Sequence, residues 1–243
     1  GEGTDWQDEI FQNAAMHNHP INISGGNDNV KYSISGGYLK QEGIAIGSDF
    51  ERFSARVNID NKITKWLSTG LRASVAKTTQ HNTIDNGNII RTAIEQLPDT
   101  PARNPDGSWG AQETTNFGTY FANPVAEALM RENYDKGTQM YIDFFADFTL
   151  WKGLVFRAEY AGNYSYSNNY YYQPFYDYGH YTQTSEGRRS ANNGSNWTLK
   201  TYLTYNGTFG KHNVSAMVGH EAQENSWENL QASRTNYLFN TVH

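Results

Sequence analysis

Four charged side chains have spacings that could support acid–base chemistry. Asp143 and Asp147 are four residues apart and Arg157 and Glu159 are two apart, so each pair falls on one face of an extended strand. Paired carboxylates can act as a general acid and a general base. Charges on neighbouring strands also form cross-strand salt networks, and we expect a network here instead of catalysis.

The other residue types that carry chemistry are absent or isolated. The chain has no cysteine, which removes disulfides, thiolate metal sites and cysteine nucleophiles. His17 and His19 could reach one metal ion from a strand, but without further ligands we expect them to face solvent. The sequence has no Ser/His/Asp order, phosphate-binding loop or metal motif. We therefore expect no enzymatic activity, no cofactor and no bound metal.

Aromatic residues gather in the segment 168–178. A tyrosine-rich loop can stack on sugar rings or support a protein partner, and its rings can equally pack the loop onto its neighbours. The sequence leaves both readings open, and Trp109 is a similar candidate. The candidate ligand- or partner-binding residues in outer loops are Trp109, Tyr170, Tyr171, Tyr172, Tyr176 and Tyr178.

Composition favours strands joined by turns. Hydrophobic residues make up 37% of the 243 residues, the mean hydropathy is −0.76, and no apolar run of about 18 residues exists, which excludes a transmembrane helix. A transmembrane barrel remains possible, because its strands alternate lipid-facing and water-facing residues. Aromatic residues reach 14%, which favours β structure. The net charge of −6 gives no basic patch, so we expect no nucleic-acid partner.

Apolar and polar residues alternate with period two in about eight segments. In residues 140–150, Met140, Ile142 and Phe144 share one face with further apolar residues, whereas Tyr141 and Asp143 lie on the other. Most of these segments reach the roughly 9–11 residues that cross a bilayer at a tilt. The expected strands are 21–25, 32–38, 53–60, 67–76, 140–150, 154–163, 197–205 and 214–218.

The connections between these strands alternate between short and long. Short turns are expected at 26–29, 61–65, 151–153 and 210–212, and long loops at 42–49, 80–137, 165–195 and after residue 224. Apolar residues at helical spacing predict a helix near 89–97, and Pro124 predicts a second from 124 to 131. A membrane barrel sorts short turns to one rim and long loops to the other.

The polar face of these strands carries most of the charge. In a barrel it would line a wet lumen, and in a soluble protein it would be an ordinary solvated face. We expect the lumen arrangement because of the strand length and the sorting of loops. The predicted lumen-facing residues are Arg56, Arg72, Asp143, Asp147, Arg157, Glu159 and Lys200.

An ordered series of short motifs resembles one protein family. The motifs are residues 4–11 (TDWQDEIF), 21–26 (INISGG), 32–39 (YSISGGYL), 41–44 (QEGI), 53–60 (FSARVNID), 65–67 (KWL), 104–109 (NPDGSW), 123–126 (NPVA) and 219–221 (GHE). Together they resemble SusC/RagA-type TonB-dependent transporters of the bacterial outer membrane. The resemblance implies that residues 1–243 are a segment of the barrel of about 22 strands, roughly its second to ninth, with the plug domain and remaining strands absent.

The resemblance also implies partners and a location. The implied function is TonB-energised import of large nutrients such as glycans or peptides, and the implied location is the bacterial outer membrane. The implied partners are a SusD-like surface lipoprotein, a TonB complex reached through the absent N-terminal part, the nutrient and the lipid of the outer membrane. An alternative is a secreted β-sandwich that binds glycans or adheres, and a weaker one is a glycan-active enzyme, for which no converging carboxylate pair is apparent. One curved sheet with an apolar convex face would support the transporter, whereas two stacked sheets would exclude it.

Overall fold

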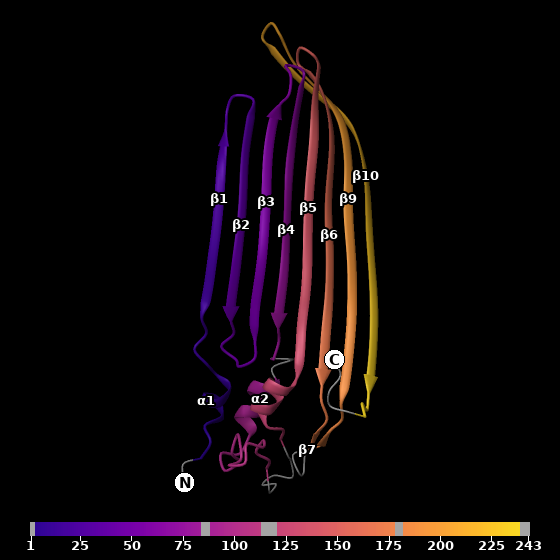
Figure 1. The fold of residues 1–243 in the computed structure, drawn as a ribbon. Helices are drawn as coiled ribbons and strands as arrows, with labels where there is room; N and C mark the ends of the chain where they lie inside the picture. The colour runs from indigo at the N-terminus through magenta and orange to yellow at the C-terminus, as the bar shows by residue number, and fades with distance from the viewer. Residues whose placement is uncertain (1–2, 84–87, 113–120, 178–181, 239–243) are drawn as a thin grey trace.

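Eight long strands form one antiparallel sheet in which each strand pairs with its neighbour in the sequence (Figure 1). The structure is a computed structural model and describes residues 3–83, 88–112, 121–177 and 182–238. The sheet has the order β1 (Met16–Gly26), β2 (Val30–Glu42), β3 (Asp49–Lys62), β4 (Leu67–His81), β5 (Glu132–Trp151), β6 (Leu154–Gln173), β9 (Glu186–Phe209) and β10 (His212–Thr235). A separate two-residue pair joins β7 (Tyr176–Asp177) to β8 (Thr182–Gln183).

The register between strands separates apolar from polar residues. Val57 lies opposite Ala73, and Ala73 opposite Ile142, so one face is apolar. One residue along, Arg56 lies opposite Ser74, and Ser74 lies opposite Tyr141 on the other side of the sheet. We call the first side the apolar face and the second the polar face. The predicted count of about eight alternating strands is confirmed.

No second layer covers the apolar face in the part of the chain that the structure describes. Side chains such as Ile34, Phe53, Phe144 and Val218 are 45–68% exposed, although apolar groups of this size are normally buried in water-soluble proteins. The eight strands make a single sheet, and the two-stranded β7–β8 pair is far too small to cover it. The β-sandwich alternative, which requires two stacked sheets, is therefore wrong.

Short and long connections lie at opposite ends of the sheet, as predicted (Figure 1). The short turns between β1 and β2, β3 and β4, β5 and β6, and β9 and β10 all lie at the end drawn at the top of Figure 1. The helices lie at the opposite end, which also holds the longer connections. Within the described part of the chain, no helix is both long and apolar enough to cross a membrane.

Strands near the long loops extend further than expected. The predicted loop at 165–195 is wrong over most of its length, because β6 continues to Gln173 and β9 begins at Glu186. The expectation of a loop after residue 224 is also wrong, because β10 continues to Thr235. These extensions carry Ser, Asn, Gln and Tyr on both faces, so the sequence loses its apolar alternation although the backbone pairing continues.

Three short helices pack together at the long-loop end. They are α1 (Trp6–Ile10), α2 (Asn88–Glu95) and α3 (Pro124–Met130), and we call them the helix cluster. The buried residues Trp6, Ile10, Ala93 and Val125 form its core. Both predicted helices are confirmed, whereas α1 was not expected.

Local sequence explains why two of these helices begin where they do. The Asn123 side chain accepts hydrogen bonds from the backbone N–H groups of Val125 and Ala126, and Pro124 fits the first turn. Asp5 caps α1 in the same way through the N–H groups of Gln7 and Asp8. A polar capping side chain directly before the helix therefore determines where α1 and α3 begin.

A buried ion pair lies in the helix cluster. Arg131 Nη2 donates to Glu127 Oε1 at 3.0 Å, and the two side chains are only 5% and 3% exposed. Burial raises the pKa of Glu127, and the charge and hydrogen bond of Arg131 oppose that rise. Removing one member would therefore leave the other as an uncompensated buried charge.

We expect Arg131→Met to destabilise the helix cluster by about 3–5 kcal/mol, because Glu127 loses its counter-ion in a buried site. Amide hydrogen exchange over residues 121–131 measures this loss directly. Arg91→Met is the matched control, because Arg91 and Glu95 form an exposed pair with the same i,i+4 spacing and should change protection by less than about 1 kcal/mol. Equal loss of protection in both variants would contradict the role of burial.

Candidate functional site

The structure places all seven predicted lumen-facing residues on the polar face. Alternation along each strand and the register between strands put Arg56, Arg72, Asp143, Asp147, Arg157, Glu159 and Lys200 on one side of β3, β4, β5, β6 and β9. Their positions follow from the pleat, because residues directly opposite on antiparallel strands project to the same side.

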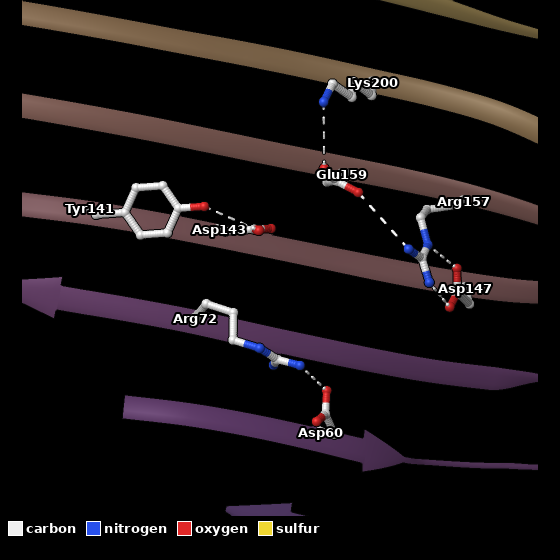
Figure 2. A network of polar contacts seen from close by, with 8 residues as sticks. All are labelled: Asp60, Arg72, Tyr141, Asp143, Asp147, Arg157, Glu159 and Lys200. Carbon is white, nitrogen blue, oxygen red and sulfur yellow. Dashed lines mark hydrogen bonds and ion pairs between the residues drawn. The ribbon is translucent and has the colours of Figure 1, made fainter. Parts of the chain in front are cut away.

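Asp147 and Arg157 form a two-pronged ion pair on this face (Figure 2). They lie directly opposite each other on β5 and β6. Arg157 donates from Nε to Asp147 Oδ1 at 2.5 Å and from Nη2 to Oδ2 at 2.6 Å. Such two-pronged pairing fixes both side chains, because the planar guanidinium matches the carboxylate. The pair therefore holds β5 and β6 in register.

Charge pairing continues across the sheet (Figure 2). Glu159 lies 4.0 Å from Arg157 and 3.9 Å from Lys200, which extends the chain of charges from β5 through β6 to β9. On β3 and β4, Arg72 Nη2 contacts Asp60 Oδ1 at 2.6 Å. Every carboxylate in these contacts faces a cation, so the network largely neutralises itself.

Phe145 connects the two groups of charges and was not identified as a site residue from the sequence. The guanidinium of Arg157 stacks over its ring at 4.3 Å, and that of Arg72 lies 5.9 Å from the ring centre. The ring occupies the space above Gly70, which lies directly opposite on β4. An aromatic residue opposite a glycine on a polar face is the sequence signal that could have revealed it. We call Asp60, Arg72, Phe145, Asp147, Arg157, Glu159 and Lys200 the charge network.

Arg56 lies outside the charge network. With Arg52 it lines a hollow of about 590 Å³ on the polar face, to which Asn22, Tyr141 and Asn163 also contribute. Neither arginine has an ion-pair partner among the residues that the structure describes. The hollow draws residues from all six strands β1 to β6, so the polar face is concave. Its free guanidinium and amide groups can bind carboxylate, sulfate or hydroxyl groups.

Asp143 has a different environment from the other carboxylates. Its Oδ2 accepts a hydrogen bond from the Tyr141 hydroxyl at 3.3 Å, and its Oδ1 is buried without a hydrogen-bond partner in the described part of the chain. Such an atom is costly unless another group completes it. Asp143 Oδ1 is therefore a hydrogen-bond acceptor beside the charge network that no described residue satisfies.

The carboxylates of the charge network are directed at cations. Both oxygens of Asp147 are held by one guanidinium, so they are not directed at an open substrate position. Across the described residues, no group of three His, Cys, Asp or Glu side chains could hold a metal ion. His17 and His19 stack on one strand with ring centres 6.4 Å apart.

The tyrosine-rich segment is mostly strand and not loop, which corrects the expected position of these residues. Tyr170, Tyr171 and Tyr172 lie in β6, with Tyr171 on the polar face and the other two on the apolar side of the sheet. Tyr171 is buried, and its hydroxyl donates to Gln173 Oε1 at 2.8 Å. Tyr172 is buried too, whereas Tyr170 is half-buried.

The remaining aromatic candidates lie beyond β6. Tyr176 is buried in β7 against Ala122 and Ala126. Trp109 packs against the core of the helix cluster and stacks on Arg103, whose guanidinium lies 3.6 Å from the ring centre. Tyr178 lies outside the described residues. Packing therefore accounts for Trp109 and Tyr176, and their binding of a ligand or partner stays a prediction.

We expect a double-mutant cycle on Asp147→Asn and Arg157→Gln to give a coupling free energy of about 1.5–3 kcal/mol, because each charged hydrogen bond contributes on that scale. Urea titration of the folded protein, followed by tryptophan fluorescence, measures the cycle. The matched cycle on Asp60→Asn and Arg72→Gln should give about 1 kcal/mol or less, because that pair is more exposed. Coupling near zero for the first pair would contradict its structural role.

Comparisons with known proteins find long, clear similarities. The TonB-dependent receptor P3 of Formosa agariphila is 30% identical over 98% of this chain and 24% of its own length. The TonB-dependent receptor SusC of Bacteroides thetaiotaomicron is 32% identical over 50% of this chain and 12% of its own length. The chain thus spans about a quarter of the length of the curated relative that it matches throughout. No family model matches the chain.

Solved structures agree on the fold. The RagAB peptide importer in its open-open state superposes with a TM-score of 0.78 over 98% of this chain and 27% of that chain, at 23% identity. The RagAB peptide transporter gives a TM-score of 0.75 at 24% identity, over 97% of this chain and 27% of that chain. The chain belongs to the SusC/RagA-type TonB-dependent receptors, and its curved sheet is part of their transmembrane antiparallel β-barrel.

Proposed function

We propose that this chain forms part of the wall of an outer-membrane importer that is energised by TonB and takes up large nutrients, either glycans or peptides. The observation that carries the proposal is the separation of the two faces: the apolar face is uncovered, and the polar face is concave and charged. A bilayer on one side and a water-filled lumen on the other would satisfy both faces. Family membership supports the same function.

The placement of short turns at one end and longer connections at the other indicates how the sheet would be oriented across the membrane. Barrels of this kind have short turns at the periplasmic rim and longer loops outside the cell. The helix cluster and the loops around Trp109 would then lie at the cell surface, where a SusD-like lipoprotein could contact them. A protein of similar fold, RagAB, is a peptide importer, which supports import as the function of the whole assembly. We propose residues 1–243 as one barrel segment, with the plug and TonB-contacting parts elsewhere in the whole protein.

The polar face would stabilise the pairing of the strands and supply charged groups to the lumen, and it would not catalyse a reaction. The charge network ties together strands that must resist opening while nutrients and a plug move past them. Arg52 and Arg56 line the hollow and have no ion-pair partner among the described residues. These two groups would be able to contact a plug or a passing substrate, and the proposal requires no catalytic residue.

We expect Ile142→Arg to impair insertion into lipid vesicles, since Ile142 is central on the apolar face and an arginine at the bilayer midplane costs about 2–4 kcal/mol. Tyr141→Arg is the matched control, because the adjacent residue faces the polar hollow beside Asp143. Gel mobility of unheated samples, together with protease protection, measures the folded and inserted fraction of the full-length protein. Equal insertion of both variants would show that the apolar face does not contact lipid.

Import itself is tested in cells that lack the gene and carry it again on a plasmid. We expect complemented cells to accumulate either fluorescent oligosaccharides or fluorescent oligopeptides, and to lose that uptake when TonB is disrupted. The two pools distinguish the two substrate classes. Uptake of neither pool, or uptake that is indifferent to TonB, would argue against an energised importer.

A further inference from the structure

Three basic residues occupy the apolar-face side of the sheet near its long-loop end. Lys136 on β5, Arg189 on β9 and Arg234 on β10 are all exposed. Each lies over a tyrosine ring: Lys136 Nζ is 4.9 Å from the centre of Tyr134, and Arg189 Cζ is 4.5 Å from the centre of Tyr170. Arg234 stacks similarly on Tyr237 at 5.5 Å.

None of these three cations has a carboxylate partner among the described residues. The contrast with the charge network is direct, because there each carboxylate faces a cation. Two acidic residues lie on the same side of the sheet: Glu132, opposite Tyr172, and Glu228, which lines a separate hollow. The hollows that Lys136, Arg189 and Arg234 line contain no acidic residue in their described lining.

The cations line connected hollows. Lys136, Tyr170 and Arg189 line one hollow of about 420 Å³ with Ala232 and the largely exposed Leu230. An adjoining hollow of about 250 Å³ shares Tyr170, Arg189 and Ala232 and adds Arg234. A site with cations at its sides and small apolar residues in its floor fits a group that is anionic and partly apolar.

A third hollow lies nearer the apolar belt, on the same side of the sheet. It has a volume of about 330 Å³, and its lining includes Thr138, Met140, Tyr164 and Tyr166, with Glu228 at its β10 side. Thr138 and Met140 follow Lys136 along the same side of β5, and Met140 begins the apolar run that ends at Leu150. A path thus runs from the cationic hollow down to the side chains that would contact hydrocarbon.

The height of the site matches the edge of a membrane. The segment from Met140 to Leu150 rises about 33 Å along the strand, or about 25 Å along the membrane normal at a tilt of about 40°. Lys136 is four residues further, about 10 Å beyond the belt by the same geometry. Long basic side chains reach toward headgroups from such positions, with their carbon stems on apolar surface.

We propose that this side of β5, β6, β9 and β10 binds an outer-leaflet lipid, with its phosphate between Lys136 and Arg189 and an acyl chain along Tyr166, Tyr164 and Met140. The inference rests on the proposed membrane orientation. A phosphate suits a cluster of basic groups, and the route to the apolar belt requires a lipid instead of a free anion. No substrate or lipoprotein partner is needed for this site.

The test uses full-length protein in detergent and native mass spectrometry, with dioctanoyl phosphatidic acid as the probe. We expect the Lys136→Gln/Arg189→Gln variant to bind it about 30-fold more weakly, the loss expected for two basic residues near an anionic lipid. Lys152→Gln/Lys211→Gln removes the same charge from the short-turn end and should retain the wild-type affinity. Unheated gel mobility verifies that both variants are folded.

Three results would overturn the lipid site. They are equal binding by the two double variants, equal binding of zwitterionic dioctanoyl phosphatidylcholine, and competition by inorganic phosphate at the concentration where phosphatidic acid binds. Failure of the membrane assignment is distinguishable from these results, because the wild-type protein would then not insert into vesicles. Failure of the lipid site alone leaves insertion and TonB-dependent uptake intact.

Discussion

Backbone hydrogen bonding in a medium without water is the constraint on which the rest of this structure depends. Hydrocarbon offers no partner for an N–H or C=O group, so a membrane-crossing strand must pair along its whole length. Antiparallel neighbours joined by turns such as Lys152-Gly153 provide that pairing with minimal connection. Once the backbone groups are hydrogen-bonded in this way, each side chain projects from one of the two faces of the sheet. Because side chains alternate between faces along a strand, a period-two sequence places apolar residues toward lipid and polar residues toward the lumen.

The same constraint explains which parts of the fold could be predicted. Where one face meets lipid and the other meets water, as from Met140 to Leu150, alternation is strong and the strand is evident in the sequence. Beyond the belt both faces meet water, so the end of β6 carries Asn and Tyr on both faces, and the end of β10 carries Ser on both faces. Nothing in the pattern of those residues separates a paired strand from a loop. The ends of β6, β9 and β10 were missed for that reason.

Residue parity predicted the face of every charged candidate, but it could not predict their partners. Pairing depends on the register that each turn sets, and the β5–β6 hairpin is irregular. Trp151 lies opposite Leu154, whereas Thr149 lies opposite Val155, so the register shifts by one residue between them. Without that shift Asp147 would face Ala158, and the polar side of β5 would meet the apolar side of β6. The bulge restores the match and brings Asp147 to Arg157, and the alternation along each strand does not determine where such a bulge falls.

The bulge also explains how residues whose spacing suggests acid–base chemistry come to pair with one another across neighbouring strands. Catalysis needs a carboxylate with an oxygen open to substrate, and the restored register closes both oxygens of Asp147 against one guanidinium. Phe145 supports the other side of that guanidinium, and the absence of a side chain at Gly70 leaves room for its ring. Each of these features stiffens the contact between adjacent strands. In the proposed importer, charges that satisfy one another would suit a lumen wall that meets moving cargo, and unpaired groups such as Arg52 and Arg56 would remain to bind it.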